Sequence, residues 1–195
     1  DPLWSRGLGD VYKRQAQAGD LAIRVVALPT SMSGLDTVDL KSKKVKIGGI
    51  KTFADGSIQG YTGYLGQPYH TPFHGDASYR GFPRADREAL AQQVLGHHKA
   101  GRQLLVHGNG DAAIDDILHA FRRAQEEAPR SNARHTVIHS QTVREDQLDE
   151  MKRLNVIPSY FILHTYYWGD RHRDVFLGPV PVSYTHLRAH ETRED

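Results

Sequence analysis

Residues 104–111 have the sequence LLVHGNGD, a short apolar run that ends in a histidine and a glycine-rich turn. A second segment, HTVIHSQT at residues 135–142, places His139 in the same way after an apolar run. Each segment is followed by residues with the apolar spacing of a helix. In a parallel α/β barrel, a strand, a loop and a helix follow one another in this order, and catalytic groups lie at the C-terminal ends of the strands. The two segments therefore predict consecutive β/α units, with His107 and His139 at the same end of the sheet.

Hydrophobic periodicity extends this alternation along the chain. The expected strands are residues 21–28, 45–54, 103–107, 135–139 and 156–162, and the expected helices are residues 85–99, 111–127 and 142–154. Asp111 is placed to cap the second helix, and TVRE at residues 142–145 has the form of a capping box. Strands that alternate with helices predict an α/β fold with a parallel sheet, as in a (β/α)8 TIM barrel. A doubly wound open sheet is the alternative that this pattern leaves open.

Two irregular features interrupt the alternation. Gly48 and Gly49 lie inside an expected strand, where they predict a bend or a close approach of two backbone segments. Residues 55–83 contain many Gly, Pro and Tyr residues and form an expected loop of unusual length. Loops of this length in compact domains usually have a function. We therefore expect this loop to lie over the strand ends as a lid or as a wall of a substrate site.

The composition indicates a soluble globular protein. Of the 195 residues, 38% are hydrophobic and 25% are charged, which are ordinary fractions for such a domain. The net charge of +2, with scattered basic residues, argues against a nucleic-acid partner. The chain has no cysteine, which excludes disulfides and thiolate metal ligands. No apolar run approaches the roughly 18 residues of a membrane span and no signal peptide is visible, so we expect no membrane partner and a cytoplasmic location.

The residue types at the strand ends suit a metal site. Histidine is a common neutral nitrogen ligand of zinc, and a catalytic zinc usually has three protein ligands and one position for water. His107 and His139 are two candidate ligands, and Lys51 in GGIKTFADGS, residues 48–57, is a third. Burial in an apolar strand favours the neutral amine of a lysine, which can react with carbon dioxide to give a carbamate that bridges two cations. These residues predict a divalent metal, zinc above all, as one or two ions.

Each candidate also has a structural interpretation. A single histidine at a strand end is more often hydrogen-bonded within the protein than bound to a metal, and a single lysine is more often solvated. Asp111 is either a helix cap or a hydrogen-bond partner that orients His107. His135 shares a strand face with His139 but lies at the opposite end, where barrel residues contribute to stability. Histidines on the expected helices and in the long loop are interpreted as packing or solvent-facing residues: His70, His74, His97, His98 and His119.

An ordered set of motifs runs through the interior of the chain: GIKTFADGS (49–57), VHGNGDAAID (106–115), IHSQT (138–142), PSYF (158–161) and YWGDRH (167–172). Over roughly residues 16–178, this set resembles the amidohydrolase superfamily, in particular its family-3 branch related to N-substituted formamide deformylases. The resemblance implies a metal-dependent (β/α)8 barrel that hydrolyses amide or related C–N bonds through a metal-activated water.

The resemblance also implies roles for single residues. Lys51 matches a strand-4 lysine that is often carboxylated in binuclear members, while His107 and His139 match the metal ligands of strands 5 and 6. The expected substrate-binding residues are Asp55, His164 and Trp168. No residue of this chain matches the aspartate of strand 8, which handles the proton of the attacking water, and none matches the His-x-His pair of strand 1. The sequence therefore predicts no catalytic base of its own.

These missing elements predict that the sequence is a fragment. Residues 16–181 would correspond to roughly strands 3 to 7 of a parent barrel, with little activity and weak metal retention in isolation. Residues 1–15 and 182–195 are expected to be non-native tails, because SRGLGDVYKRQ (5–15) and VSYTHLRAHET (182–192) resemble translated sequencing-adapter DNA. The origin expected for such a fragment is an environmental, metagenomic assembly.

The leading functional hypothesis is an enzyme whose parent protein hydrolyses the C–N bond of a small amide-type substrate. The alternative is a non-catalytic, barrel-derived binding or scaffold fragment whose histidines only stabilise loops. A phosphate-handling α/β enzyme is the least favoured class, because GNG at residues 108–110 lacks the third glycine of a phosphate-binding loop.

Overall fold

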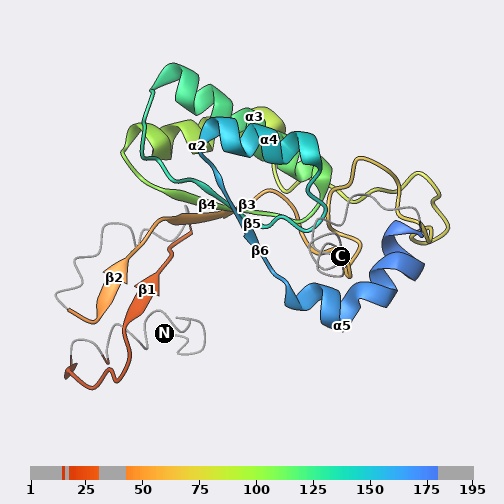
Figure 1. Cartoon of the computed structure of the whole chain (residues 1–195), viewed down its shortest axis with the longest axis horizontal. Helices are drawn as coiled ribbons and strands as arrows, with labels where there is room; N and C mark the ends of the chain where they lie inside the picture. The colour runs from red at the N-terminus through yellow and green to blue at the C-terminus, as the bar shows by residue number, and fades with distance from the viewer. Residues whose placement is uncertain (1–14, 16–17, 31–42, 180–195) are drawn as a thin grey trace, which may run out of the picture. The chain divides into compact units, whose positions relative to one another are not determined.

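The computed structural model describes residues 15, 18–30 and 43–179 (Figure 1). Apart from Gln15, the expected tails at residues 1–15 and 182–195 lie outside the described residues and stay a prediction. The chain divides into two units, Asp1–Lys51 and Thr52–Asp195.

The first unit contains a small parallel sheet. Strand β1 (Val25–Ala27) pairs with strand β2 (Val45–Ile47), so the strand expected at residues 21–28 is shorter than its apolar pattern suggested. Gly48 follows β2 directly, and a Cβ atom at this position would lie 2.8 Å from the side chains of Val26 and Leu28. The close approach predicted from the glycines is therefore confirmed.

The expected strand at residues 45–54 is divided by the two glycines. After β2, the chain bends at Gly48 and Gly49 and continues as β3 (Ile50–Phe53). Strand β3 begins at the end of the first unit and ends in the second. It forms the edge of a four-stranded sheet with the order β3-β4-β5-β6.

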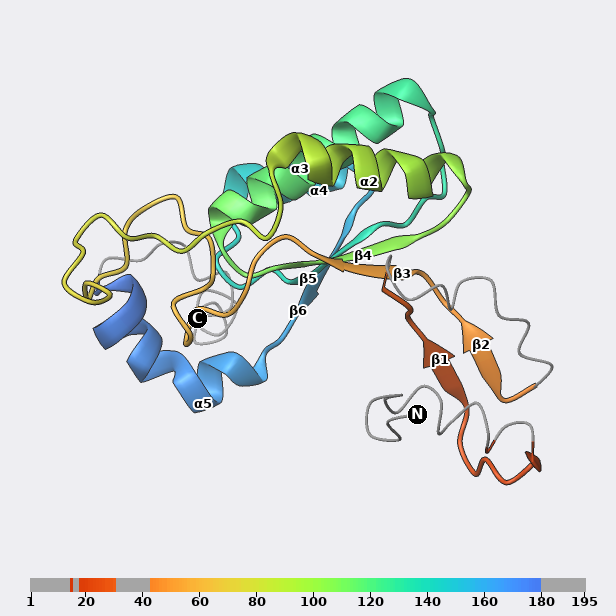
Figure 2. The ribbon, with the colours of Figure 1, turned by 180° about the vertical axis from the view of Figure 1, so that it is seen from behind.

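The β/α alternation predicted from the sequence is present in the second unit. Its strands are β4 (Leu104–Gly108), β5 (Thr136–His139) and β6 (Ile157–Tyr160), and its first helices are α2 (Arg87–Lys99), α3 (Asp111–Glu127) and α4 (Glu145–Leu154). All three strands are parallel, and β4 pairs with β5 so that Gly108 lies opposite His139. The three helices lie on one side of the sheet in both views (Figure 1 and Figure 2). Helices on a single face are typical of a barrel wall, whereas a doubly wound sheet carries helices on both faces.

The main core lies between these helices and the sheet. Ile114, Ile117 and Phe121 of α3 are fully buried, as their helical spacing predicted. They pack in one cluster with buried strand residues, among them Leu104 and Val137. Full burial of each such side chain contributes about 1.5–3 kcal/mol. This packing fixes α3 on the sheet and thereby fixes the turn that carries the residues after β4.

Two helix starts differ from the sequence prediction. The N-cap of α3 is Gly110, and Asp111 is the first helical residue without a capping hydrogen bond. The N-cap of α4 is Arg144, whose backbone N–H donates to the Gln147 side chain at 3.0 Å. Thr142, expected as the N-cap, instead donates its hydroxyl to the carbonyl of Asn109 at 2.9 Å. The Asp111 side chain likewise bonds to a distant segment, since it accepts the backbone N–H of Gly66. Both side chains therefore join loops instead of capping helices.

The long loop at residues 55–83 is present, and it is packed against the C-terminal part of the described chain. Tyr69 and Phe176 belong to a small buried cluster with Ile58 and Leu65. The backbone N–H of His70 donates to the carbonyl of Phe176 at 2.9 Å. These contacts give the loop a fixed structure, while its role as a lid or as a wall of a substrate site stays a prediction.

The segment after β6 is helical, although it is not among the expected helices. Helix α5 (Leu163–Arg171) continues as the π-helix η2 (His172–Leu177). Tyr166 and Tyr167 of α5 are 82% and 69% exposed. Exposed aromatic residues obscure the helical period, because that period is recognised from apolar residues that face a core. Among the described residues, no helix is long and apolar enough to cross a membrane.

Candidate functional site

His107 and His139 lie side by side at the C-terminal ends of neighbouring strands. His107 is the penultimate residue of β4, and His139 is the last residue of β5. Their ring centroids are 4.6 Å apart, with the rings at 76° to each other. The His107 side chain is only 14% exposed. The parallel register brings the two strand ends together by pairing Gly108 of β4 with His139, whose φ of 75° departs from regular strand geometry.

The hydrogen bonds of His107 determine which ring nitrogen carries its proton. Nε2 lies 2.9 Å from the carbonyl oxygen of Gly56, which can only accept a hydrogen bond. Nε2 also lies 3.1 Å from Nδ2 of Asn109, which can only donate, so the shorter contact with Gly56 favours the tautomer with the hydrogen on Nε2 and the lone pair on Nδ1. Asn109 donates its Nδ2 to the same carbonyl at 2.7 Å. Histidines that bind metals commonly donate their second nitrogen to a carbonyl or carboxylate in this way.

Asp55 connects the long loop to the turn after β4. Its carboxylate accepts backbone N–H groups from Tyr64 at 3.0 Å, Asn109 at 3.0 Å and Gly110 at 2.8 Å. The residue is 1% exposed, and Oδ1 lies 3.5 Å from Nε2 of His107. These bonds make Asp55 a positioning residue, while the substrate contact expected for it stays a prediction.

The backbone at the end of β5 is strained. His139 and Ser140 have φ angles of 75° and 47°, in the left-handed region that costs residues other than glycine roughly 1–2 kcal/mol each. The strain is held by hydrogen bonds to the neighbouring turn, since Ser140 donates its N–H to the carbonyl of Gly108 at 3.1 Å. Strained backbone is common at functional sites, where it aims a side chain.

His164 extends the pair to a row of histidines. Its ring stacks on that of His139 at 5.8 Å and 18°. Burial lowers the pKa of His164, which keeps the ring neutral, and its buried Nδ1 has no hydrogen-bond partner among the described residues. Trp168, the other aromatic residue expected at the substrate, lies in α5 with the Arg171 guanidinium 5.5 Å from its ring centroid. The structure therefore places the His164 ring beside His139, one of the two candidate ligands, while the substrate contact expected for Trp168 stays a prediction.

Two residues near this row were not singled out from the sequence. His172 is fully buried in η2, 6.3 Å from His164 between ring centroids, and Gln141 places its Nε2 3.2 Å from the His172 ring. Burial and the neighbouring His164 lower the pKa of His172 to about 4. Both residues lie inside the quoted motifs IHSQT and YWGDRH, so the motifs contained the signal, but only the fold shows that they meet.

Lys51 and Asp111, the remaining candidates from the sequence, have surroundings that differ from those of the histidine row. Lys51 is in β3, at the end of the first unit, and its Nζ is shielded from solvent. Asp111 was expected to orient His107, but its carboxylate accepts the Gly66 N–H at 2.8 Å and an Arg144 N–H at 3.2 Å. Asp111 thus ties the long loop to the start of α4.

The donor set fits part of a metal site. His107 and His139 offer neutral nitrogen ligands from adjacent strands, and the Gly56 carbonyl fixes His107 in the tautomer with a lone pair on Nδ1. Within the described ranges, no three His, Cys, Asp or Glu side chains are grouped as metal ligands. A complete site would therefore combine this histidine pair with at least one ligand of another kind or from elsewhere.

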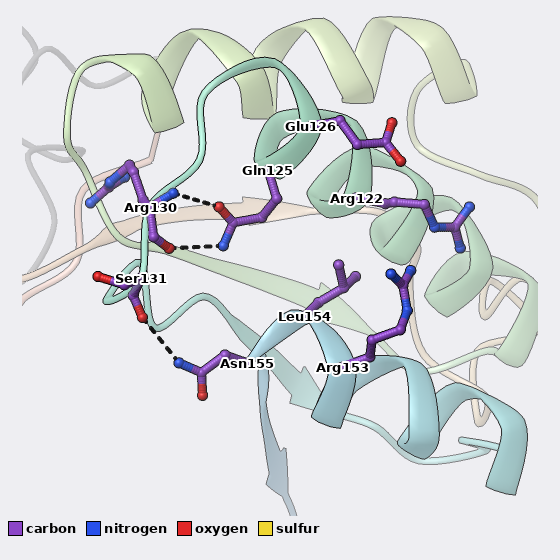
Figure 3. A pocket seen from close by; sticks show the side chains of 8 residues that line it. All are labelled: Arg122, Gln125, Glu126, Arg130, Ser131, Arg153, Leu154 and Asn155. Atoms are coloured by element: carbon purple, nitrogen blue, oxygen red, sulfur yellow. Dashed lines mark hydrogen bonds between the residues drawn. The ribbon is translucent and has the colours of Figure 1, made fainter.

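A cavity of about 370 Å³ lies at the other end of the sheet, between the ends of α3 and α4 (Figure 3). Its polar groups bond to one another: Gln125 exchanges two hydrogen bonds with the backbone of Arg130, and Asn155 donates to the carbonyl of Ser131. These bonds hold the turn before β5. The residues that line the cavity thus stabilise this turn, and the cavity is separate from the candidate site.

Comparisons with known proteins agree with the fold. YtcJ of Bacillus subtilis (strain 168), an amidohydrolase by its name, is 29% identical over 133 residues, which cover 66% of this chain and 24% of YtcJ. Crystal structures of uncharacterized metal-dependent hydrolases from Pyrococcus horikoshii OT3 and Pyrococcus furiosus are 26% and 23% identical, each with a TM-score of 0.66. Each covers 82% of this chain, but the chain covers only 32% and 33% of those chains.

These proteins are three to four times longer than the matched region, so the chain spans a quarter to a third of their length. Their similarity, together with the helices on one face of a parallel sheet, identifies the α/β fold as part of a (β/α)8 barrel. The model of the Amidohydrolase family matches residues 3–192. Since this match extends over nearly the whole sequence, the chain belongs to the Amidohydrolase family.

Proposed function

We propose that this chain forms part of a metal-dependent hydrolase that cleaves amide-type C–N bonds in small molecules. Family membership and the similarity to metal-dependent hydrolases support a hydrolytic, metal-assisted reaction. The observation that carries the proposal is the His107 and His139 pair, with its ring centroids 4.6 Å apart at the strand ends. The C-terminal ends of strands are where barrel enzymes hold their catalytic groups.

In this proposal, His107 binds the metal through Nδ1 and His139 provides a second nitrogen. Lys51, as a neutral amine or a carbamate, is the third ligand, and zinc is the preferred ion, with one or two ions bound. A bound divalent metal would polarise the substrate carbonyl and lower the pKa of a water molecule so that it can attack. The carbonyl of Gly56 and the Asp55 carboxylate hold the His107 ring in place, which preserves the direction of its lone pair.

The substrate would lie against the row of aromatic and polar groups beyond the histidine pair. His164 is suited to bind a polar group of the substrate, because its buried Nδ1 has no partner in the described part of the chain. Trp168 would provide an apolar contact, and Asp55 would act mainly through the loop that it fixes. No residue of this chain is proposed as the catalytic base.

A zinc titration of the full 195-residue chain tests the proposal. Calorimetry is expected to show weak, reversible Zn²⁺ binding, which His107→Ala and His139→Ala each reduce at least tenfold. His119→Gln is the matched control, because its ring is on the surface of α3 and pairs with Glu88. If both alanine variants bind Zn²⁺ as the unchanged chain does, the histidine pair is not a metal site and the non-catalytic scaffold becomes the better account.

A further inference from the structure

Two buried histidines are hydrogen-bonded at the end of the sheet opposite to the candidate site. His98 lies in the last turn of α2, and His135 directly precedes β5. Their exposed fractions are 0% and 2%. His98 Nδ1 and His135 Nε2 are 2.8 Å apart, which is a short hydrogen bond between two imidazole rings.

The ends of this pair determine the position of every proton in it. His98 Nε2 lies 2.7 Å from the carbonyl oxygen of Ala128, so Nε2 is the donor and Nδ1 holds a lone pair. His135 Nε2 must then donate to His98 Nδ1. Consequently His135 Nδ1 is the acceptor for the backbone N–H of Leu104, which lies 3.0 Å away. The chain of hydrogen bonds runs in one direction, from β4 through both rings to the C-terminus of α3.

This arrangement has no place for another proton. A proton on His135 Nδ1 would face the Leu104 N–H, so that two donors oppose each other. A proton on His98 Nδ1 would face the donating Nε2 of His135. If the His135 hydrogen then moved to Nδ1, it would again oppose the Leu104 N–H. Any protonation therefore breaks one hydrogen bond of the chain and leaves a buried donor unpaired.

The surroundings also oppose a positive charge. The ring of Phe121 on α3 stacks on His135 at 4.7 Å, and the Arg130 guanidinium donates to the carbonyl of His98 at 3.0 Å. Lys99 and Glu127, the neighbouring charges on α2 and α3, pair with each other at 3.0 Å. Burial lowers the pKa of His98, and burial together with His98 and Arg130 lowers the pKa of His135 to about 3.

We propose that the His98 and His135 pair is an acid-sensitive latch, which joins α2, the end of α3 and the starts of β4 and β5 only while both rings are neutral. The unfolded chain protonates both rings near pH 6.5, whereas the latched rings stay neutral well below that pH. The unfolded state therefore binds more protons in this range, so folding stability is present above pH 6.5 and decreases as the pH falls. Each ring should change the unfolding equilibrium constant by about tenfold per pH unit in this range.

Nitrogen-15 spectra of the imidazole rings test the latch directly. In the full chain at pH 7.5 and at pH 5.0, His98 and His135 should each show one protonated nitrogen, Nε2, and one unprotonated nitrogen, Nδ1. An Nδ1–H tautomer in either buried ring, or a ring that titrates near pH 6.5, would overturn the proposal.

A pair of variants gives an independent test by denaturant unfolding between pH 7.5 and 5.0. The double variant His98→Gln, His135→Gln should be less stable at pH 7.5 but should lose less stability on acidification than the unchanged chain. His119→Gln is the control and should keep the full pH dependence. The other buried histidines, His164 and His172, are common to all three proteins, so their contribution cancels. Equal pH dependence of the double variant and the unchanged chain would contradict the latch.

Discussion

Among single residues, Asp55 contributes most to the arrangement of the candidate site. Its buried carboxylate accepts three backbone N–H groups, from the long loop and from the turn after β4, and lies beside Nε2 of His107. Hydrogen bonds to a charged group are stronger than neutral ones, and buried donors left without a partner are costly. The position of His107 thus depends on a residue that need not touch either metal or substrate.

Replacement of Asp55 by alanine should therefore lower the free energy of unfolding by about 3 kcal/mol. Three buried N–H groups would lose their acceptor, and the carbonyl of Gly56 would no longer be held beside His107. Denaturant unfolding measures the change. Asp170→Ala is the control, because the Asp170 side chain is 89% exposed, and it should change stability by less than about 0.5 kcal/mol. Equal effects of the two variants would contradict the role given to Asp55.

For single residues, the sequence predicted which residue types could bind a metal, but not which hydrogen bonds hold their side chains in place. His107 and His139 could be placed at the same end of the sheet because each ends a strand of a parallel pair, whereas the left-handed φ of His139 could not be predicted from the strand pattern. The bonds of Asp111 to Gly66 and Arg144 depend on the path of the long loop, which has no periodicity to interpret. The contact between Gln141 and His172 joins residues whose distance in space follows only from the fold.

Among the elements, the β/α units from β4 to β6 were predictable because each buries one regular face. The ends of these elements were harder to predict. Gly110, for example, is the N-cap of α3, a position that Asp111 was expected to fill. Helix α5 was missed because its aromatic residues face solvent. Local periodicity thus predicts elements that pack on the sheet, and it fails for caps and for helices outside the main core.

A pair of glycine substitutions tests how the loop is joined to the sheet. A Cβ atom at Gly110 would lie 1.8 Å from the carbonyl oxygen of Tyr64, so Gly110→Ala should displace the loop and destabilise the fold by about 3 kcal/mol. Hydrogen exchange should become faster around Tyr64. Gly96 lies in α2 with open space around it, and Gly96→Ala should stabilise the fold by about 0.5–1 kcal/mol. A tolerated Gly110→Ala would mean that the loop is not held against this turn.

For the whole molecule, buried neutral histidines predict a loss of stability in mild acid. The pKa of His135 is lowered to about 3 and that of His172 to about 4, both from 6.5. Between pH 6.5 and 4 the unfolded chain therefore binds more protons than the folded chain, and stability falls with falling pH by up to about 1.4 kcal/mol per unit for each histidine. Urea unfolding at several pH values measures this slope. A stability that is constant from pH 7 to pH 5 would contradict it.

The exposed aromatic face of α5 has a second consequence for the whole molecule. Tyr166 and Tyr167 are mostly exposed, and Ile162 and Leu163 beside them are 63% and 53% exposed. Contiguous apolar surface of this kind promotes association. The isolated chain should self-associate at micromolar concentration, and Tyr166→Ser with Tyr167→Ser should shift it toward monomer in light scattering. A chain that is already monomeric before substitution would contradict this expectation.

In the proposed function, His107 and His139 bind a divalent metal through nitrogens selected by the fold. The most direct measurement is the imidazole nitrogen-15 spectrum of the full chain, recorded with and without Zn²⁺. Zn²⁺ should shift Nδ1 of His107 and one nitrogen of His139, while Nε2 of His107 keeps its proton and its hydrogen bond to Gly56. A shift confined to other histidines, or loss of the proton from Nε2 of His107, would contradict it.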